Sequence, residues 1–325
     1  MTPHAPGSAR PASSRQRIRG VLAPVLTPFD DQLAPDIGRF TRHCSWLLEQ
    51  RVGLAIFGTN SEAASLSAAE RMMLTEALLE AGIPASRLMP GTGACSLSEA
   101  VLLTRHAVRH GAAGVLALPP FFFKAVSEDG LFRFYSEVIE RVADDRLNLY
   151  LYNIPQFSGV PITLELIERL LKRYPDIVAG AKDSSGDWNN SLRMIEAFGA
   201  DGFDVFPASE SLLGKGMRAG AAGCISATVN VHPSAIQALY DNWSRPDAER
   251  LQANVDAVRR IFETRPMIPA MKATVAHYAG ADESWRSVRP PLVAMNSADS
   301  GALVAALEDC GFDMPGYPQA SVVDA

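Results

Sequence analysis

From residue 20 onward, the sequence repeats one unit: a short apolar run, a polar tip and then a segment with helical periodicity. Most of the apolar runs lack polar alternation, which is typical of parallel strands that are buried on both faces. Successive runs start roughly 20 to 35 residues apart, the length of a strand followed by a returning helix. The eight runs are residues 20–29, 52–60, 87–93, 114–123, 147–155, 177–185, 203–210 and 222–230.

The segments between the runs carry the start signals of helices. Ser67 with Glu70 and Ser96 with Glu99 have the spacing of capping boxes. Eight strand–helix units predict a (β/α)8 barrel. A doubly wound open sheet is the alternative, but such a sheet normally begins with a glycine-rich dinucleotide loop, and no G-x-G-x-x-G follows any run.

Composition divides the chain into a barrel and three flanking segments. Residues 1–17 are rich in Pro, Ser and Arg and nearly free of large apolar side chains, so we expect a disordered tail there. Residues 18–233 contain the units of the barrel. Residues 234–310 hold more helical pattern than one barrel helix requires, which predicts the last barrel helix followed by a C-terminal helical appendage. Residues 311–325 are expected to form a second tail.

The overall composition is that of a globular protein, with 47% hydrophobic and 20% charged residues. The net charge of −6 disfavours a nucleic-acid partner, because phosphates need a basic face. No apolar stretch is long enough to span a membrane, so no membrane partner is expected. The cysteines lack CxxC spacing, which favours reduced thiols in a cytoplasmic protein over a disulfide framework or a zinc site. They are Cys44, Cys95, Cys224 and Cys310.

One lysine at a strand end suits nucleophilic chemistry. In a barrel, the active site gathers at the C-terminal ends of the strands, and Lys182 follows a buried apolar run. Burial favours the neutral amine, which attacks a carbonyl carbon to form a Schiff base. The alternative is a solvated lysine that pairs with the neighbouring Asp183.

Two further strand ends carry groups that suit this chemistry. Tyr152 lies in the preceding apolar run, and a phenol held there can move a proton between the imine and the substrate. Alternatively, Tyr152 packs its ring and bonds its hydroxyl to the backbone. Thr59 and Asn60 follow the second run, where backbone N–H groups suit a carboxylate and the threonine hydroxyl lies beside them.

A pair of histidines has the spacing of metal ligands. His106 and His110 lie four residues apart on a predicted helix. The sequence places no carboxylate near them, so we expect a surface pair and predict no metal.

Four strand ends together resemble the dihydrodipicolinate synthase/N-acetylneuraminate lyase family of Schiff-base-forming class I aldolases. The resemblance extends over about residues 18–300, and its motifs occur in order at the corresponding strands. Residues 58–62 (GTNSE) are similar to the family's GTTGE-like loop, and residues 152–155 (YNIP) to its YNxP. Residues 180–183 (GAKD) are similar to its G-x-K-[DE], and residues 223–226 (GCIS) to its G-x-I-S.

The resemblance implies a mechanism that needs no metal or organic cofactor. Lys182 would attack the keto carbon of pyruvate or another 2-oxo acid, and Tyr152, oriented by Thr59, would move the protons. Backbone N–H groups of Thr59 and Asn60, with the turn near Ile225, would bind the substrate carboxylate. The resemblance also implies that the protein is a homotetramer.

Departures from the family pattern bear on the substrate. Ser61 replaces the glycine of GTTGE, so the turn there is expected to differ. Phe157 stands where the synthase has an arginine for the carboxylate of its second substrate. Residues 121–123 are all phenylalanine and lack the hydroxyl that completes the synthase's proton relay from a neighbouring subunit. The chain therefore resembles more closely the neuraminate lyase and 2-keto-3-deoxy sugar-acid aldolase branches.

Two further residues indicate what the far end of the substrate carries. Glu210 and Ser226 fall where the neuraminate lyases bind sugar hydroxyls, and a carboxylate with a hydroxyl suits a polyol. The alternative is that Glu210 caps the following helix.

We therefore expect a Schiff-base-dependent lyase that cleaves a hydroxylated 2-oxo acid, such as a 2-keto-3-deoxy sugar acid, to pyruvate and an aldehyde. A Schiff-base dehydratase of a deoxy keto sugar acid is the alternative. A dihydrodipicolinate synthase and a non-catalytic family member that binds a small acid are less favoured.

Overall fold

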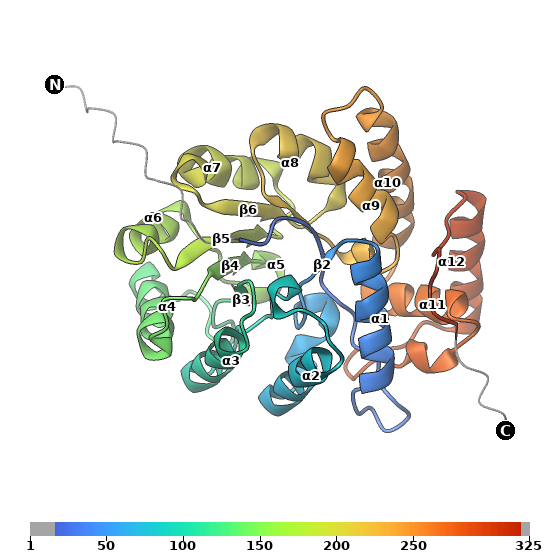
Figure 1. Cartoon of the computed structure of the whole chain (residues 1–325), viewed down its shortest axis with the longest axis horizontal. Helices are drawn as coiled ribbons and strands as arrows, with labels where there is room; N and C mark the ends of the chain where they lie inside the picture. Colours follow the sequence, from blue (N-terminus) through green and yellow to red (C-terminus); the bar gives the residue numbers. More distant parts are fainter. Residues whose placement is uncertain (1–16, 320–325) are drawn as a thin grey trace.

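Parallel strands form the inner wall of a barrel, and α-helices surround this wall (Figure 1). The computed structural model describes residues 17–319, so the predicted N-terminal tail, apart from Arg17, lies outside the described residues. The strands form two sheets, with the orders β2–β1–β7 and β3–β4–β5–β6. The strands are β1 (Gly20–Ala23), β2 (Gly53–Leu54), β3 (Val115–Ala117), β4 (Leu149–Asn153), β5 (Val178–Asp183), β6 (Asp204–Pro207) and β7 (Gly223–Ile225).

The predicted third strand is not a regular strand, although it completes the barrel. Within residues 87–93, Leu88 forms an isolated bridge with Leu54 of β2, and Gly91 forms one with Leu116 of β3. These two bridges join one sheet to the other. The run therefore occupies the predicted place in the barrel wall, but it pairs through isolated bridges and forms no continuous strand.

Two close backbone approaches complete the barrel wall. A Cβ atom on residue 91 would lie 2.0 Å from the carbonyl oxygen of Phe57, so Gly91 is required where these segments meet. On the other side of the barrel, the N–H of Ala222 donates to the carbonyl of Val205 (2.9 Å) and links β6 to β7. The two sheets therefore close, and the predicted (β/α)8 barrel is confirmed.

Helices alternate with the strand positions and pack on the outside of the barrel (Figure 1). Ser67 and Glu70 form the predicted capping box at the N-terminus of the helix over residues 68–80. At the N-terminus of the helix over residues 97–109, Ser96 accepts a hydrogen bond from the N–H of Glu99. The barrel helices are α1 (Ile37–Glu49), α2 (Ala68–Glu80), α3 (Leu97–Arg109), α4 (Glu128–Val142), α6 (Leu164–Arg173), α7 (Trp188–Phe198), α8 (Leu213–Ala219) and α9 (Pro233–Asn242), with a short α5 (Pro155–Ser158) after β4.

Three further helices follow the barrel and form the C-terminal appendage. They are α10 (Ala248–Glu263), α11 (Met267–Tyr278) and α12 (Ser297–Asp309). Helix α10 packs against α8 and α9, and α11 packs against α10 and α12. The appendage therefore extends the barrel wall on the side of α9 (Figure 1).

The expected second tail is wrong for residues 311–319, which pack on the body of the protein. Phe312, Met314 and Tyr317 are buried. The indole N–H of Trp46 donates to the carbonyl of Pro315 (3.1 Å) and holds the segment against α1. Three large apolar side chains in so short a segment bury enough surface to order it.

The interior of the barrel is a packed core. Every strand position contributes at least one buried side chain to a layer that crosses the barrel. The layer consists of Leu22, Ala55, Met89, Leu116, Tyr150, Ala179, Phe206, Ala222 and Ile225. Because side chains fill the interior, a ligand can bind only at an end of the barrel.

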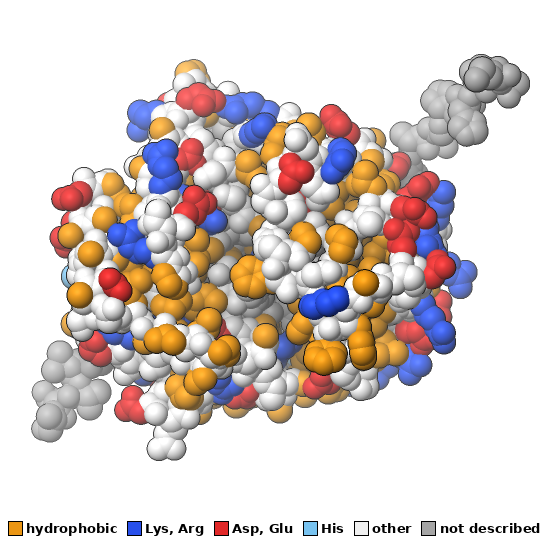
Figure 2. Space-filling model, turned by 180° about the vertical axis from the view of Figure 1, so that it is seen from behind, with side chains coloured by type: hydrophobic (Ala, Val, Ile, Leu, Met, Phe, Trp, Pro, Cys, Tyr) orange, Lys and Arg blue, Asp and Glu red, His pale blue; other side chains and the backbone are white. Residues whose placement is uncertain are grey.

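The surface carries both apolar and charged regions. On the face opposite to that of Figure 1, hydrophobic side chains gather around the middle, and charged side chains crowd one edge (Figure 2). Within residues 17–319, no helix has the length and apolar character needed to cross a membrane.

A buried ion pair joins the loop after β2 to the appendage. The side chains of Glu62 and Lys272 are both 0% exposed, and Lys272 Nζ donates to Glu62 Oε1 (2.5 Å). Lys272 also donates to the carbonyl of Ser287 (2.6 Å), and Glu62 Oε2 accepts from the N–H of Arg289 (2.9 Å). Burial lowers the pKa of Lys272 to about 8, although the charge of Glu62 opposes this shift.

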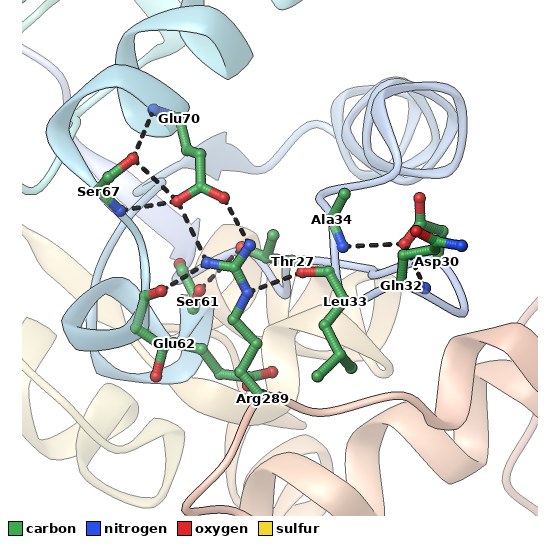
Figure 3. A network of polar contacts seen from close by, with 11 residues as sticks. Thr27, Asp30, Gln32, Leu33, Ala34, Ser61, Glu62, Ser67, Glu70 and Arg289 are labelled. Carbon is green, nitrogen blue, oxygen red and sulfur yellow. Dashed lines mark hydrogen bonds and ion pairs between the residues drawn. The ribbon is translucent and has the colours of Figure 1, made fainter.

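Arg289 extends this network to the start of α2 (Figure 3). Its guanidinium donates to the carboxylate of Glu70 and to the carbonyls of Ser65 and Leu33. The hydrogen bond from Arg289, helped by Ser67, lowers the pKa of Glu70 to about 2. The segment before α12 is thereby tied to the loop between β2 and α2.

We predict that Lys272→Met lowers the free energy of unfolding by about 3–5 kcal/mol, because the substitution leaves the Glu62 carboxylate buried without a cation. Urea unfolding followed by circular dichroism measures the change. Lys172→Met is the matched control, since Lys172 is exposed and its pair with Glu168 lies on the surface, and it should change stability by less than about 0.5 kcal/mol. Equal effects of the two substitutions would contradict this role of the ion pair.

Candidate active site

The site forms where β4 and β5 end side by side. In the parallel register of these strands, Tyr152 lies opposite Lys182. Lys182 is 2% exposed, and its Nζ donates to the hydroxyl of Tyr152 (3.1 Å). The ammonium also lies 4.2 Å from the centre of the Tyr152 ring. The strand register thus brings together the predicted nucleophile and the predicted proton carrier.

Asp183, the next residue on β5, points to different partners. Its carboxylate accepts hydrogen bonds from Asn153 Nδ2 (2.8 Å) and Ser191 Oγ (2.6 Å), and from Ser185. Successive side chains on a strand face opposite ways, so Asp183 is turned from Lys182. Among residues 17–319, no ion pair joins these two side chains, and Lys182 is buried instead of solvated.

The charge of Lys182 acts on Tyr152. Burial by itself would raise the pKa of the phenol, but the neighbouring ammonium and hydrogen bonds involving Thr59, Lys182 and Ser184 together lower the pKa of Tyr152 below its ordinary value. A phenol with a lowered pKa gives up its proton more readily, which is what a group that relays protons needs.

A short turn after β2 places Thr59 against Tyr152. Thr59 begins a 3-10 turn (Thr59–Ser61), and its Oγ1 lies 3.0 Å from the Tyr152 hydroxyl. The hydroxyl of Thr27 donates to the carbonyl of Ser61 (2.8 Å). Ser61 Oγ accepts a hydrogen bond from the N–H of Gly58 (3.2 Å). The serine at the family's glycine position therefore stabilises the turn, and the residue with positive φ is Glu62 (55°).

A cavity of about 770 Å³ opens at this end of the barrel. Lys182, Tyr152 and Thr59 line it together with Asn60 and Ile225, as five of the predicted site residues. The first N–H groups of a helical turn have no acceptor within that turn, so those of Thr59 and Asn60 are suited to a carboxylate. A second cavity of about 580 Å³ adjoins the first and shares Thr59 and Tyr152 with it.

Glu210 and Ser226 are close to each other but lie behind this cavity. Glu210 is 1% exposed, and its carboxylate accepts hydrogen bonds from the hydroxyls of Ser226 and Thr228. Arg259 of α10 forms an ion pair with Glu210 (3.2 Å) and a hydrogen bond with Ser226 (3.2 Å). Neither Glu210 nor Ser226 is among the described residues that line the cavity, whereas Arg259 is. Ser209, and not Glu210, caps the 3-10 turn that begins there.

Sequence reasoning missed Arg259. Burial alone would lower its pKa, but the charges of Glu210 and Glu263 raise the pKa of the guanidinium above its ordinary value. Glu263, which also lines the cavity, forms an ion pair with Arg259 across one helical turn (2.8 Å). The Arg–Glu pair at i, i+4 was visible in the sequence. Nothing in the sequence indicated that α10 faces the site.

Exposed aromatic side chains lie on α5 and on the loop after β3. Phe157 is 70% exposed and borders both cavities, where its ring offers no charge to a substrate. Phe122 and Phe123 are 75% and 71% exposed. Lys124 Nζ donates to the carbonyl of Ser158 (2.7 Å), which holds the loop after β3 against α5.

Comparison with known proteins gives one consistent family. The model of the "Dihydrodipicolinate synthetase family" matches residues 17–310. A relative from Chloroflexus aurantiacus, described as an "Uncharacterized DapA-like lyase", is 31% identical over 293 residues, which cover 89% of this chain and 96% of the relative.

Solved structures agree with this match. The crystal structure of dihydrodipicolinate synthase from Agrobacterium tumefaciens has a TM-score of 0.83 at 29% identity and covers 90% of this chain and 99% of that chain. A variant of the 2-keto-3-deoxygluconate aldolase from Sulfolobus solfataricus has a TM-score of 0.80 at 18% identity, covering 90% and 96% of the two chains. A synthase and an aldolase thus share this fold, so the fold alone does not select the reaction.

We predict that Thr59→Val raises the pKa of Tyr152, because the substitution removes one of the hydrogen bonds that lower it. Ultraviolet difference titration against the Tyr152→Phe variant isolates the signal of this phenol. Thr264→Val, at the exposed end of α10, is the control and should leave the titration unchanged. A Tyr152 titration that does not move in Thr59→Val would show that the hydroxyl contact has no electrostatic effect.

Proposed function

We propose a carbon–carbon lyase activity for this chain, which belongs to the dihydrodipicolinate synthetase family. The substrate would be a hydroxylated 2-oxo acid, and the products would be pyruvate and an aldehyde. The observation that carries the proposal is the row of hydrogen-bonded side chains Lys182, Tyr152 and Thr59 at the end of the barrel, with contacts of 3.1 and 3.0 Å.

The first step forms the Schiff base. Lys182 first loses the proton of its ammonium through its contact with the hydroxyl of Tyr152, and the neutral amine then attacks the keto carbon of the substrate. The resulting carbinolamine loses water to give an imine. Tyr152 supplies and removes the protons of these steps, because its hydroxyl contacts Lys182 Nζ. The substrate carboxylate accepts hydrogen bonds from the N–H groups of Thr59 and Asn60, beside Ile225.

The second step breaks the carbon–carbon bond. Tyr152 removes the proton of the C4 hydroxyl, the C3–C4 bond breaks, and the electron pair moves into the protonated imine to form an enamine. The C4 fragment leaves as an aldehyde. Protonation of the enamine at C3 and hydrolysis of the imine release pyruvate and restore the amine of Lys182. The protein's own imine holds the electrons, so the step needs no further electron acceptor.

The outer part of the cavity supports a polyol tail. Ser209, Ser211 and Asp187 line it together with Arg259 and Glu263. These side chains offer hydroxyls, carboxylates and one guanidinium, which match the donors and acceptors of a sugar-acid chain. In this part of the cavity, Asp187 and Glu263 outnumber the one guanidinium, which disfavours a second anionic group on the substrate.

The residue at the entrance disfavours dihydrodipicolinate synthesis. That reaction requires a second substrate with its own carboxylate, and Phe157 offers neither charge nor hydrogen-bond donor to bind one.

The exposed rings of Phe122 and Phe123 support assembly with other copies of the chain, as expected for a homotetramer.

We predict that pyruvate and borohydride label Lys182 covalently, because reduction traps the imine on its amine. Peptide mass spectrometry locates the adduct. Lys182→Met should lose the label, and Lys172→Met should keep it, since Lys172 lies on the surface. An adduct on another lysine, or none at all, would refute the mechanism.

With 2-keto-3-deoxygluconate as substrate, equal amounts of pyruvate and aldehyde identify a lyase, whereas loss of water at constant carbon number identifies a dehydratase.

We predict that Glu210→Gln weakens turnover of 2-keto-3-deoxygluconate while leaving pyruvate trapping at Lys182 nearly intact. The loss of a charged hydrogen-bond partner of Arg259 should cost about 1.5–3 kcal/mol, which lowers kcat/KM roughly 10- to 160-fold. Glu249→Gln is the control, because Glu249 is 80% exposed and pairs with Arg218 on the surface. Equal losses in turnover and trapping would assign Glu210 a purely structural role, and no loss would exclude it from substrate recognition.

A further inference from the structure

Three potential metal ligands meet on the outer surface of the barrel, away from the cavity. His106 lies in the last turn of α3 and His110 caps the C-terminal end of this helix, with ring centres 4.5 Å apart. The fold adds Glu76 from the neighbouring α2, whose Oε1 lies 2.9 Å from His106 Nε2. The expectation of a plain histidine pair rested on the lack of a nearby carboxylate, and α2 supplies one.

The arrangement satisfies the geometric needs of a transition-metal site. One ligand atom from each of Glu76, His106 and His110 can be chosen so that all lie within 4.8 Å of one another. Around a tetrahedral zinc ion with bonds of about 2.0–2.2 Å, ligand atoms lie about 3.3–3.6 Å apart, so small side-chain rotations close the site. Those rotations are free, because Glu76 and His110 are exposed.

The donor set selects the class of metal. Two imidazole nitrogens and one carboxylate oxygen match zinc and its neighbours, whereas magnesium and calcium prefer oxygen ligands alone. Three protein ligands leave a fourth position of a tetrahedral ion for water. The His106 side chain is only 13% exposed, so its ring is held in place before a metal arrives.

We propose that Glu76, His106 and His110 form a surface site for Zn²⁺ or a similar transition metal. The bound ion would cross-link α2 and α3. These helices already pack against each other, and the His106–Glu76 hydrogen bond connects them. These helices follow the loops at Thr59 and Gly93, and both of those residues border the second cavity. The site is separate from the proposed reaction, which needs no metal.

The experiment titrates the full-length protein with zinc chloride by isothermal calorimetry and follows its thermal unfolding. We expect one Zn²⁺ per chain and, at about 100 times the dissociation constant, a rise in Tm of about 4 °C. Excess EDTA should reverse the rise. Magnesium chloride at the same concentration should leave the Tm unchanged.

Matched histidine variants make the result specific. His110→Ala and His106→Ala should each weaken zinc binding at least 10-fold, because each removes one of three ligands. His277→Ala removes a different exposed histidine, on α11, and should bind zinc as the wild type does. The proposal is overturned if the wild type binds no zinc, or if His110→Ala binds it unchanged. Pyruvate trapping at Lys182 should be the same in all these variants, so the proposed lyase activity stands or falls independently.

Discussion

The active end of the barrel depends on one buried carboxylate. Glu62 stands directly after the turn that carries Thr59, and it is held by Lys272 from α11 and by the backbone of Arg289. A buried carboxylate without a cation would be costly, so the turn and the appendage can fold only against each other. The position of Thr59 at Tyr152 is therefore set by residues more than 200 positions away in the chain.

The register of β4 and β5 gives the adjacent polar side chains of Lys182 and Asp183 different partners. On one face, Lys182 and Tyr152 meet in the cavity, and the ammonium lowers the pKa of the phenol. On the other face, Asp183 is satisfied by Asn153 and Ser191. A direct pair between the adjacent lysine and aspartate would hold the amine protonated and block its attack on a carbonyl. The alternation of side chains along a strand prevents that pairing.

At the far wall of the cavity, a predicted site residue lies behind another side chain. Glu210 was expected to contact the substrate, and its carboxylate is buried under Arg259, Ser226 and Thr228. The guanidinium of Arg259 lines the cavity in its place. The prediction placed the site at the correct strand end. The helix that covers this strand end is α10 of the appendage, and no sequence pattern predicts where the appendage packs.

Local patterns in the sequence determined the barrel and the capping of its helices, because strand and helix periodicity are encoded within a few residues. Strand-end chemistry, together with motifs that resemble those of a family, predicted Lys182, Tyr152 and Thr59 as site residues. Tertiary structure alone decided that residues 87–93 pair only through isolated bridges, that residues 311–319 pack on the body, and which side chains flank Glu210 and His106. These outcomes depend on contacts between segments distant in the chain. Such contacts follow from how helices and loops pack on a closed sheet, and no local pattern records them.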